Sequence, residues 1–264
     1  MIEAKGLHVT FNPGTPMQTR AMRGIDLTIS EGEFVTVIGS NGAGKSTFLN
    51  ALAGEIIVDH GHIVIDGDDV TKWPTARRAG RVARVFQDPL GGSCANLTIA
   101  ENMALAASRG KRRRLWPALT HTMRETFKAR IHELDLGLEN RLNDKMELLS
   151  GGQRQAVSLL MATLRPMKIL LLDEHTAALD PKTAAFILDL TRTIVRERRL
   201  TTVMVTHSMR QALDIGDRTV MLHEGRVVLD VSGSERRGLT IEDLLHMFEK
   251  VRGETIDDDA LLLG

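Results

Sequence analysis

The stretch EFVTVIGSNGAGKSTFLNALAG, residues 33–54, decides the fold. Its apolar, β-branched run at 34–38 has the length and composition of a buried parallel strand. A loop with three glycines in six residues follows at 39–44, and a helix is predicted from Lys45 to about Gly54. Glycines at this density allow the backbone to curl so that several N–H groups point inward. The stretch therefore predicts a strand, an anion-binding loop and a helix.

A loop of this kind suits a phosphate group, because the N-terminus of the following helix adds its unpaired donors and its positive dipole end. Lys45 would supply a positive charge for the terminal phosphates, and the Ser46 hydroxyl could reach a Mg²⁺ ion. Residues 39–46 match the whole pattern G-x-x-x-x-G-K-[ST], and they do not match the dinucleotide-binding turn G-x-G-x-x-G. A glycine-rich turn that carries a lysine by chance is the alternative, which the strand and helix on either side disfavour.

Composition narrows the class of protein. The 264 residues carry a formal net charge of zero, so no nucleic-acid partner is expected. The single cysteine, Cys94, excludes an internal disulfide framework and a multi-cysteine metal site. The N-terminal residues lack the apolar segment of a signal peptide, and no apolar run approaches the roughly 20 residues that span a bilayer. If the protein works at a membrane, we expect another chain to cross it.

The remaining pattern is that of an α/β protein. Residues 2–11 and 20–29 alternate apolar and polar side chains, which predicts two antiparallel strands. Phe11, at the end of the first, is interpreted either as a stacking face for a nucleobase or as an ordinary strand-end aromatic. Further strands are predicted at 62–65, 81–86, 168–173 and 200–206. A hairpin is predicted from 217–223 and 226–231, and a C-terminal amphipathic helix at 240–251.

Residues 88–150 differ in character, with a capping box at Thr98 and a longer helix predicted over 116–135. We expect an inserted α-helical subdomain here, within a nucleotide-binding core formed by 1–87 and 151–231. Residues 232–264 would form the C-terminal helix and an acidic, solvated tail that contains Glu254, Asp257, Asp258 and Asp259. The basic run at 111–114 is either a solvated loop or a contact with anionic lipid.

The apolar segment at 170–172 ends in two carboxylates, Asp173 and Glu174. In a parallel sheet this end faces the same crevice as the phosphate loop. Asp173 would then hold Mg²⁺, and Glu174 could polarise an attacking water as a general base.

About twenty residues earlier stands LSGGQ, residues 149–153, in which Ser150 is a natural N-cap and Gly151 and Gly152 leave space for an oxyanion. With the phosphate loop before it and LLLDE after it, the chain resembles the ATP-binding-cassette (ABC) ATPases over residues 2 to about 231. The resemblance implies a P-loop NTPase, RecA-like core with an antiparallel β subdomain and an inserted α-helical subdomain. It also implies ATP and Mg²⁺ as ligands.

The resemblance implies roles for individual residues. Glu174, His207 and Gln87 would be catalytic, with His207 as the switch histidine at the γ-phosphate and Gln87 sensing Mg²⁺ and the attacking water. The metal ligands would be Ser46, Gln87 and Asp173. In the family the LSGGQ stretch acts on the nucleotide of a second copy, in a head-to-tail dimer whose interface includes Asp180. The nucleotide contacts would come from Phe11, Ser40, Asn41, Gly42, Ala43, Gly44, Lys45, Ser46, Thr47, Ser150, Gly151, Gly152, Gln153 and Asp180.

Two residues depart from the family pattern. His175 stands where the family usually has proline after the catalytic glutamate, which gives the backbone more freedom and an N–H group. Phe11 replaces the more usual tyrosine, and the chain contains no tyrosine. Both acids are kept, so ATPase activity is expected.

The single cassette without a fused membrane segment is most similar to bacterial uptake ATPases for amino acids or other small solutes, including a group thought to serve aromatic amino acids. This implies separate transmembrane permease subunits, an extracytoplasmic solute-binding protein and a place on the cytoplasmic face of the membrane. The alternatives are an exporter ATPase, a soluble cassette acting on ribosomes or DNA, and a small-molecule kinase, which would leave LSGGQ and His207 unexplained.

Overall fold

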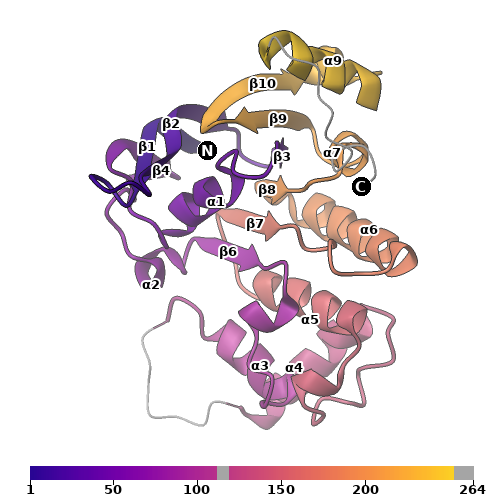
Figure 1. The fold of residues 1–264 in the computed structure, drawn as a ribbon. Helices are drawn as coiled ribbons and strands as arrows, with labels where there is room; N and C mark the ends of the chain where they lie inside the picture. The colour runs from indigo at the N-terminus through magenta and orange to yellow at the C-terminus, as the bar shows by residue number, and fades with distance from the viewer. Residues whose placement is uncertain (112–118, 253–264) are drawn as a thin grey trace. The chain divides into compact units, whose positions relative to one another are not determined.

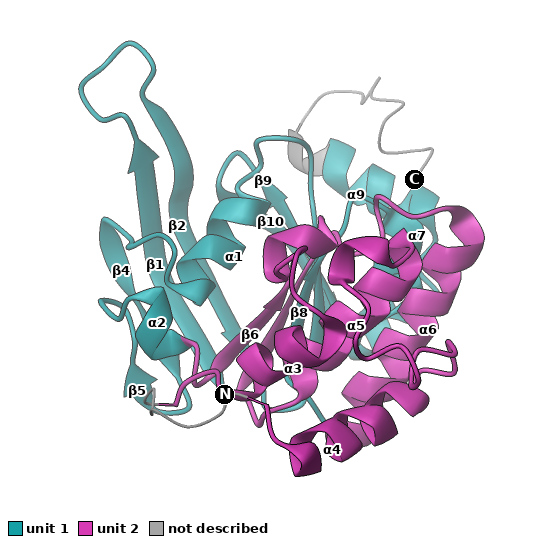
Figure 2. Cartoon of the chain, turned by 90° about the horizontal axis from the view of Figure 1, so that it is seen from below, with its two compact units in different colours: residues 1–78, 199–264 teal, residues 79–198 magenta. Residues whose placement is uncertain are grey.

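The structure is a computed structural model that describes residues 1–111 and 119–252, and Figure 1 shows the course of the chain. It divides into two compact units, residues 1–78 with 199–264 and residues 79–198, which Figure 2 shows in different colours. Arg112, Arg113 and Arg114 of the basic run, and the acidic tail, lie outside the described residues.

Unit 1 contains an antiparallel sheet with the strand order β2-β1-β4-β5. Its strands are β1 (Ile2–Phe11), β2 (Thr19–Ile29), β4 (His60–Ile65) and β5 (Asp68–Asp69). Ile2 pairs with Ile29 of β2, and the two predicted antiparallel strands are confirmed. The inward side chains of β1 alternate with exposed ones, as expected for a sheet with one buried face.

Unit 1 also contains four strands of a second sheet, which are neighbours in the order β10-β9-β3-β8. These are β3 (Phe34–Ile38), β8 (Thr202–Val205), β9 (Arg218–His223) and β10 (Arg226–Ser232). β3 runs parallel to β8 and to β9, and all five of its residues are buried, which explains its continuous apolar sequence. The helices of this unit are α1 (Lys45–Ala53), α2 (Thr75–Arg78), α7 (Met209–Asp214), α8 (Gly233–Arg236) and α9 (Ile241–Arg252).

The C-terminal helix α9 belongs to the core of unit 1. Leu244 and Phe248 are at most 1% exposed and pack in one cluster with Ile38, Met209 and Met221. Ile38 is the last residue of β3, so this cluster includes the residue directly before the glycine-rich loop.

The C-terminal end of α1 accepts hydrogen bonds from a buried arginine that was not predicted from the sequence. Arg78 is 1% exposed and donates to the carbonyls of Ala51, Leu52, Thr71 and Trp73. The last carbonyls of a helix have no partner within the helix, so a guanidinium with five donors suits this position.

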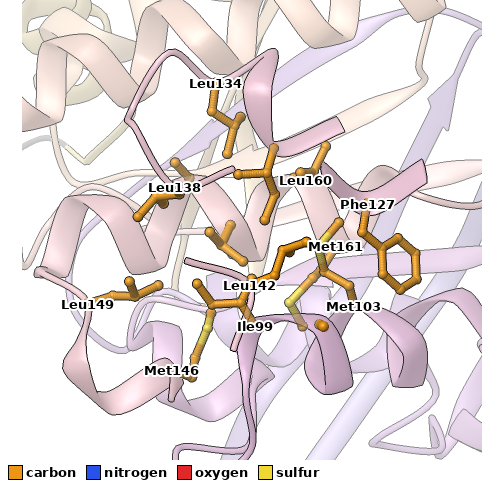
Figure 3. Close-up of a cluster of buried hydrophobic side chains, with 14 of the residues drawn as sticks. Ile99, Met103, Phe127, Leu134, Leu138, Leu142, Met146, Leu149, Leu160 and Met161 are labelled. Carbon is orange, nitrogen blue, oxygen red and sulfur yellow. The ribbon is translucent and has the colours of Figure 1, made fainter. Parts of the chain in front are cut away.

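Unit 2 contains the parallel pair β6 (Val82–Val85) and β7 (Ile169–Asp173), with Val85 opposite Leu172. Its helices are η1 (Pro89–Gly92), α3 (Ile99–Ala107), α4 (His121–His132), η2 (Met146–Leu148), α5 (Gly151–Thr163) and α6 (Pro181–Arg198). Buried side chains from several of these helices and from the loops between them form one apolar cluster, which includes Met103, Phe127 and Leu160 (Figure 3).

The long helix predicted over 116–135 is shorter, because Thr120 caps its N-terminus by accepting from the Met123 N–H. Residues 116–118 lie outside the described part of the chain. The capping box predicted at Thr98 is confirmed, with reciprocal bonds to Glu101. The assignment of 88–150 as a separate helical subdomain stays a prediction; the compact units divide instead after Arg78 and after Arg198.

Candidate functional site

The loop between β3 and α1 is built so that only glycine fits at two positions. Gly39 has a φ of 145°, and a Cβ there would lie 2.1 Å from the Leu222 carbonyl oxygen. Gly44 has a φ of 101°, and a Cβ there would lie 2.5 Å from the Ala21 oxygen. Both are backbone obstacles that cannot move aside, so the glycine-rich sequence is required by the path of the loop.

The first turn of α1 has donors but no side-chain cap. Its N-cap is Gly44, which makes no side-chain cap hydrogen bond, whereas α3 and α5 both begin with a capping box. Lys45 is 5% exposed, and its Nζ donates to the Gly39 oxygen at 2.6 Å and to the Ser40 oxygen at 3.1 Å. An ammonium group inside a loop that ends at an uncapped helix N-terminus fits the binding of a phosphate.

The other residues of 40–47 that are predicted to contact the nucleotide differ in how far they are exposed to solvent. Asn41, Gly42 and Ser46 are exposed, Ser40 and Thr47 are half-buried, and Ala43 is buried. The hydroxyl of Ser46 thus stands on the first turn of α1 at the surface.

His207 lies at the same edge of the sheet as the loop. β8 is parallel to β3, Val205 is opposite Val37, and the Thr206 N–H donates to the Val37 oxygen at 3.2 Å. His207 is therefore two residues beyond the end of β8, while the loop begins one residue beyond the end of β3. The next residue, Ser208, caps α7.

Phe11 is the last residue of β1 and is paired with Thr19 of β2. Its side chain is 39% exposed, which is high for a large aromatic residue. A partly exposed ring can stack on a planar ligand.

In unit 2, the predicted residues gather where β6 and β7 end. Since the two strands are parallel and in register, Gln87 and the pair Asp173 and Glu174 lie at one edge. Gln87 is exposed, and both acids are half-buried. Glu174 has a φ of 45°, in the left-handed region that residues other than glycine rarely adopt.

Asp173 carries an ion pair that the sequence did not predict. Arg84 of β6 donates to its Oδ2 at 2.5 Å, and the two side chains are 10% and 15% exposed. The Arg84 guanidinium also lies over the Phe86 ring, 4.7 Å from its centroid. The partners are 89 residues apart in the sequence, so no local pattern could indicate the pair.

His175, the residue that follows these two acids in the chain, is buried. It is 2% exposed, its Nε2 lies 3.0 Å from Thr191 Oγ1, and burial lowers its pKa to about 4. The ring is therefore neutral at pH 7.

The LSGGQ stretch begins α5. Ser150 Oγ accepts from the Gln153 N–H at 3.3 Å, and Gln153 Oε1 accepts from the Ser150 N–H at 3.2 Å. A serine hydroxyl that accepts one bond can still donate its own proton, so the capping box leaves Ser150 able to contact an anion.

Packing also explains why glycine stands at both positions, 151 and 152, of this stretch. A Cβ at Gly152 would lie 2.2 Å from Thr183 Cγ2, and one at Gly151 would lie 3.4 Å from Leu179 Cδ2. Because neither residue has a side chain, the residues around the start of α6 can approach α5 closely.

Asp180 stands immediately before α6, and its Oδ1 accepts from the Thr183 N–H at 3.1 Å. Hydrogen bonds from the Thr183 side chain and backbone lower its pKa. Asp180 is exposed and ionised at neutral pH, and it acts as a helix cap in this chain.

The described residues contain neither a preformed metal cluster nor a membrane-spanning helix. No group of three or more His, Cys, Asp or Glu side chains is placed to hold a metal ion within 1–111 and 119–252. In the same residues, none of the helices combines the length and apolar character that a bilayer crossing requires.

An α/β sheet edge with a glycine-rich loop, an inward lysine and an uncapped helix defines the chain as a P-loop nucleotide-binding protein. The profile of the ABC transporter family matches residues 22–177, and the chain belongs to that family. It is an ATPase of the ABC type, as the LSGGQ stretch implies, and the expected α/β P-loop fold is confirmed.

Known relatives agree with this assignment. The chain is 45% identical to a tyrosine transport ATP-binding protein of Clostridioides difficile (strain R20291), over 94% of this chain and 99% of the relative. It is 35% identical to the thiamine import ATP-binding protein ThiQ of Escherichia coli (strain K12), over 76% and 82% of the two chains. A dimeric, post-hydrolysis structure of the ATP-binding cassette MJ0796, bound to ADP and Pi, superposes with a TM-score of 0.76 at 30% identity, over 90% of this chain and all of that one.

Proposed function

We propose that this ATPase powers the uptake of a small solute through separate transmembrane permease subunits, from the cytoplasmic face of the membrane. The observation that carries the proposal is the 45% identity to a tyrosine transport ATP-binding protein along nearly the whole of both chains. Tyrosine, or another aromatic amino acid, is the first solute to test. An extracytoplasmic solute-binding protein would deliver it.

Unit 1 would hold the nucleotide. The N–H groups of residues 40–47 would donate to the phosphates, with Lys45 as the positive charge among them. Lys45 would exchange its bonds to Gly39 and Ser40 for bonds to phosphate oxygens. The partly exposed ring of Phe11 would stack on the adenine, without the polar contact that a tyrosine would add.

Unit 2 would supply the acid–base chemistry. Glu174 would accept a proton from the attacking water, because a carboxylate at this strand end can act as a general base. Gln87, at the same edge, would orient that water, and His207 of unit 1 would donate to the γ-phosphate.

Ser46, Gln87 and Asp173 would hold Mg²⁺, since hydroxyl, amide and carboxylate oxygens are the donors that this ion prefers. When bound, the ion would neutralise negative charge on the phosphate groups. Asp173 has a second oxygen, Oδ1, besides the one that Arg84 contacts. The donor set therefore fits the ion, and Arg84 would compete with it for the carboxylate.

A second copy of the chain would complete the site. The dimeric cassette MJ0796 supports this expectation. Ser150, Gly151, Gly152 and Gln153 of one copy would contact the phosphates bound by the other, with the Ser150 hydroxyl as donor. Asp180 would lie near that interface.

The relatives are named for transport and import, and they give no support to an exporter or to a soluble cassette acting on ribosomes or DNA. The direct test is the uptake of labelled tyrosine by cells that express the chain with its permease, against cells that express Lys45→Ala. Accumulation that depends on Lys45 is the expected result. Faster loss of preloaded label would show an exporter instead.

A further inference from the structure

His175 follows a strained position in the chain. Glu174 has a φ of 45°, and a left-handed conformation at such a residue persists only where its surroundings hold it. The turn that follows is closed by bonds from Ala177 N–H to the Glu174 oxygen at 2.9 Å and from Leu179 N–H to the Thr176 oxygen at 3.2 Å. A proline at position 175 would fix the φ angle of that residue through its ring, whereas a histidine leaves that angle free.

The imidazole of His175 reaches instead to helix α6. Its Nε2 lies 3.0 Å from Thr191 Oγ1, and the two residues are 2% and 0% exposed. Thr191 Oγ1 also donates to the Ile187 oxygen at 2.8 Å, the carbonyl one turn earlier in α6.

These distances fix the direction of the hydrogen bonds. A hydroxyl has one proton, and the Ile187 carbonyl can only accept it. Thr191 must therefore accept from His175, which places the ring proton on Nε2. The result is a directed chain from the ring to a helix carbonyl, in a site that water does not reach.

We propose that His175 is a positioning residue for ATP hydrolysis: its bond to Thr191 holds the backbone at residue 175, where a proline would fix φ through its ring, and so orients the carboxylate of the preceding Glu174. The inference rests on the proposed role of Glu174 as the general base. A small error in the position of a base costs rate but leaves nucleotide binding intact, because binding depends on other residues.

The test uses the full-length protein and starts with Thr191→Val, which keeps the shape of the side chain and removes the acceptor. We expect kcat for ATP hydrolysis to fall about tenfold, which corresponds to about 1.4 kcal/mol, with KM for ATP within about twofold of the wild type. Thr191→Ser retains the hydroxyl and should retain kcat. A loss of thermal stability with unchanged kcat, or a raised KM alone, would overturn the proposal.

A double-mutant cycle separates positioning from packing. His175→Pro should stay within about threefold of the wild-type kcat, because the proline restores the backbone restraint. In that background Thr191→Val should have no further effect on kcat. An equal loss in both backgrounds would contradict a role through His175.

Glu174→Gln distinguishes the two proposals. Turnover near the wild-type rate in Glu174→Gln would overturn the proposed role of Glu174 as the base, and with it the positioning role of His175. If Glu174→Gln is inactive but Thr191→Val has wild-type kcat, the base stands and only the positioning role of His175 falls.

Discussion

The guanidinium of Arg84 and the carboxylate of Asp173 form an ion pair with a 2.5 Å contact at the end of two parallel strands. Each side chain is at most 15% exposed, so the pair is poorly screened by water. Asp173 is also the carboxylate proposed to hold Mg²⁺. The Arg84 guanidinium thus already contacts the carboxylate that is proposed to bind the metal ion.

Arg84→Met should therefore strengthen metal binding. Without the guanidinium, the metal ion no longer has to displace a positive charge from the Asp173 carboxylate. The apparent Kd of Mn²⁺, measured by electron paramagnetic resonance with a non-hydrolysable ATP analogue, should therefore fall about fivefold. Arg84→Lys keeps the charge and should stay near the wild type. Weaker Mn²⁺ binding in Arg84→Met would mean that Arg84 organises the site rather than competing with the ion.

Glu174→Gln should keep ATP binding and lose turnover. The amide matches the carboxylate in shape but cannot accept a proton, so hydrolysis should fall at least about 100-fold. Because ATP is then not consumed, light scattering should detect a stable dimer with ATP. Wild-type turnover in this variant would exclude Glu174 as the base.

The glycines of the phosphate loop offer a matched pair of substitutions. Gly39→Ala would place a Cβ 2.1 Å from the Leu222 oxygen, and the free energy of unfolding should fall by about 3 kcal/mol or more. At Gly42 no atom lies within 4 Å of the position that a Cβ would take, so Gly42→Ala should cost only the left-handed strain of about 1–2 kcal/mol. Urea unfolding of both variants measures the difference, and equal losses would contradict the clash.

Arg78 should stabilise unit 1 strongly. Arg78→Leu would leave four carbonyl oxygens without this donor, and we expect the free energy of unfolding to fall by about 3 kcal/mol. The neighbouring Arg77 is exposed and lies over the Trp73 ring at 3.7 Å, so Arg77→Leu should cost at most about 1 kcal/mol. Similar losses in the two variants would show that the buried bonds of Arg78 add little.

The sequence predicted what depends on local pattern. The buried strand at 34–38 begins and ends where β3 does, because a continuous apolar run bounded by glycine has few other structures. The helix start at Thr98 was predicted from its capping box, and the one at Ser150 from serine as an N-cap residue. The short helices α2, α7 and α8 were not predicted, since four to six residues carry too little periodicity to recognise.

Contacts between residues distant in the sequence could not be predicted. Arg78 has no sequence signal that separates it from Arg77, yet one is buried and the other exposed. His175 was visible as a departure from the family pattern, but its partner Thr191 lies 16 residues away on α6. The roles of the predicted nucleotide, metal and catalytic residues stay predictions, supported by the strand edges at which they lie.

The most direct test of the account is purification of the tagged chain from detergent-solubilised membranes of its own cells, with mass spectrometry of the proteins that accompany it. We expect a multi-span membrane protein in stoichiometric amount, together with a solute-binding protein whose ligand can then be identified. Recovery only in the soluble fraction, with ribosomal or DNA-repair proteins, would contradict the role in transport.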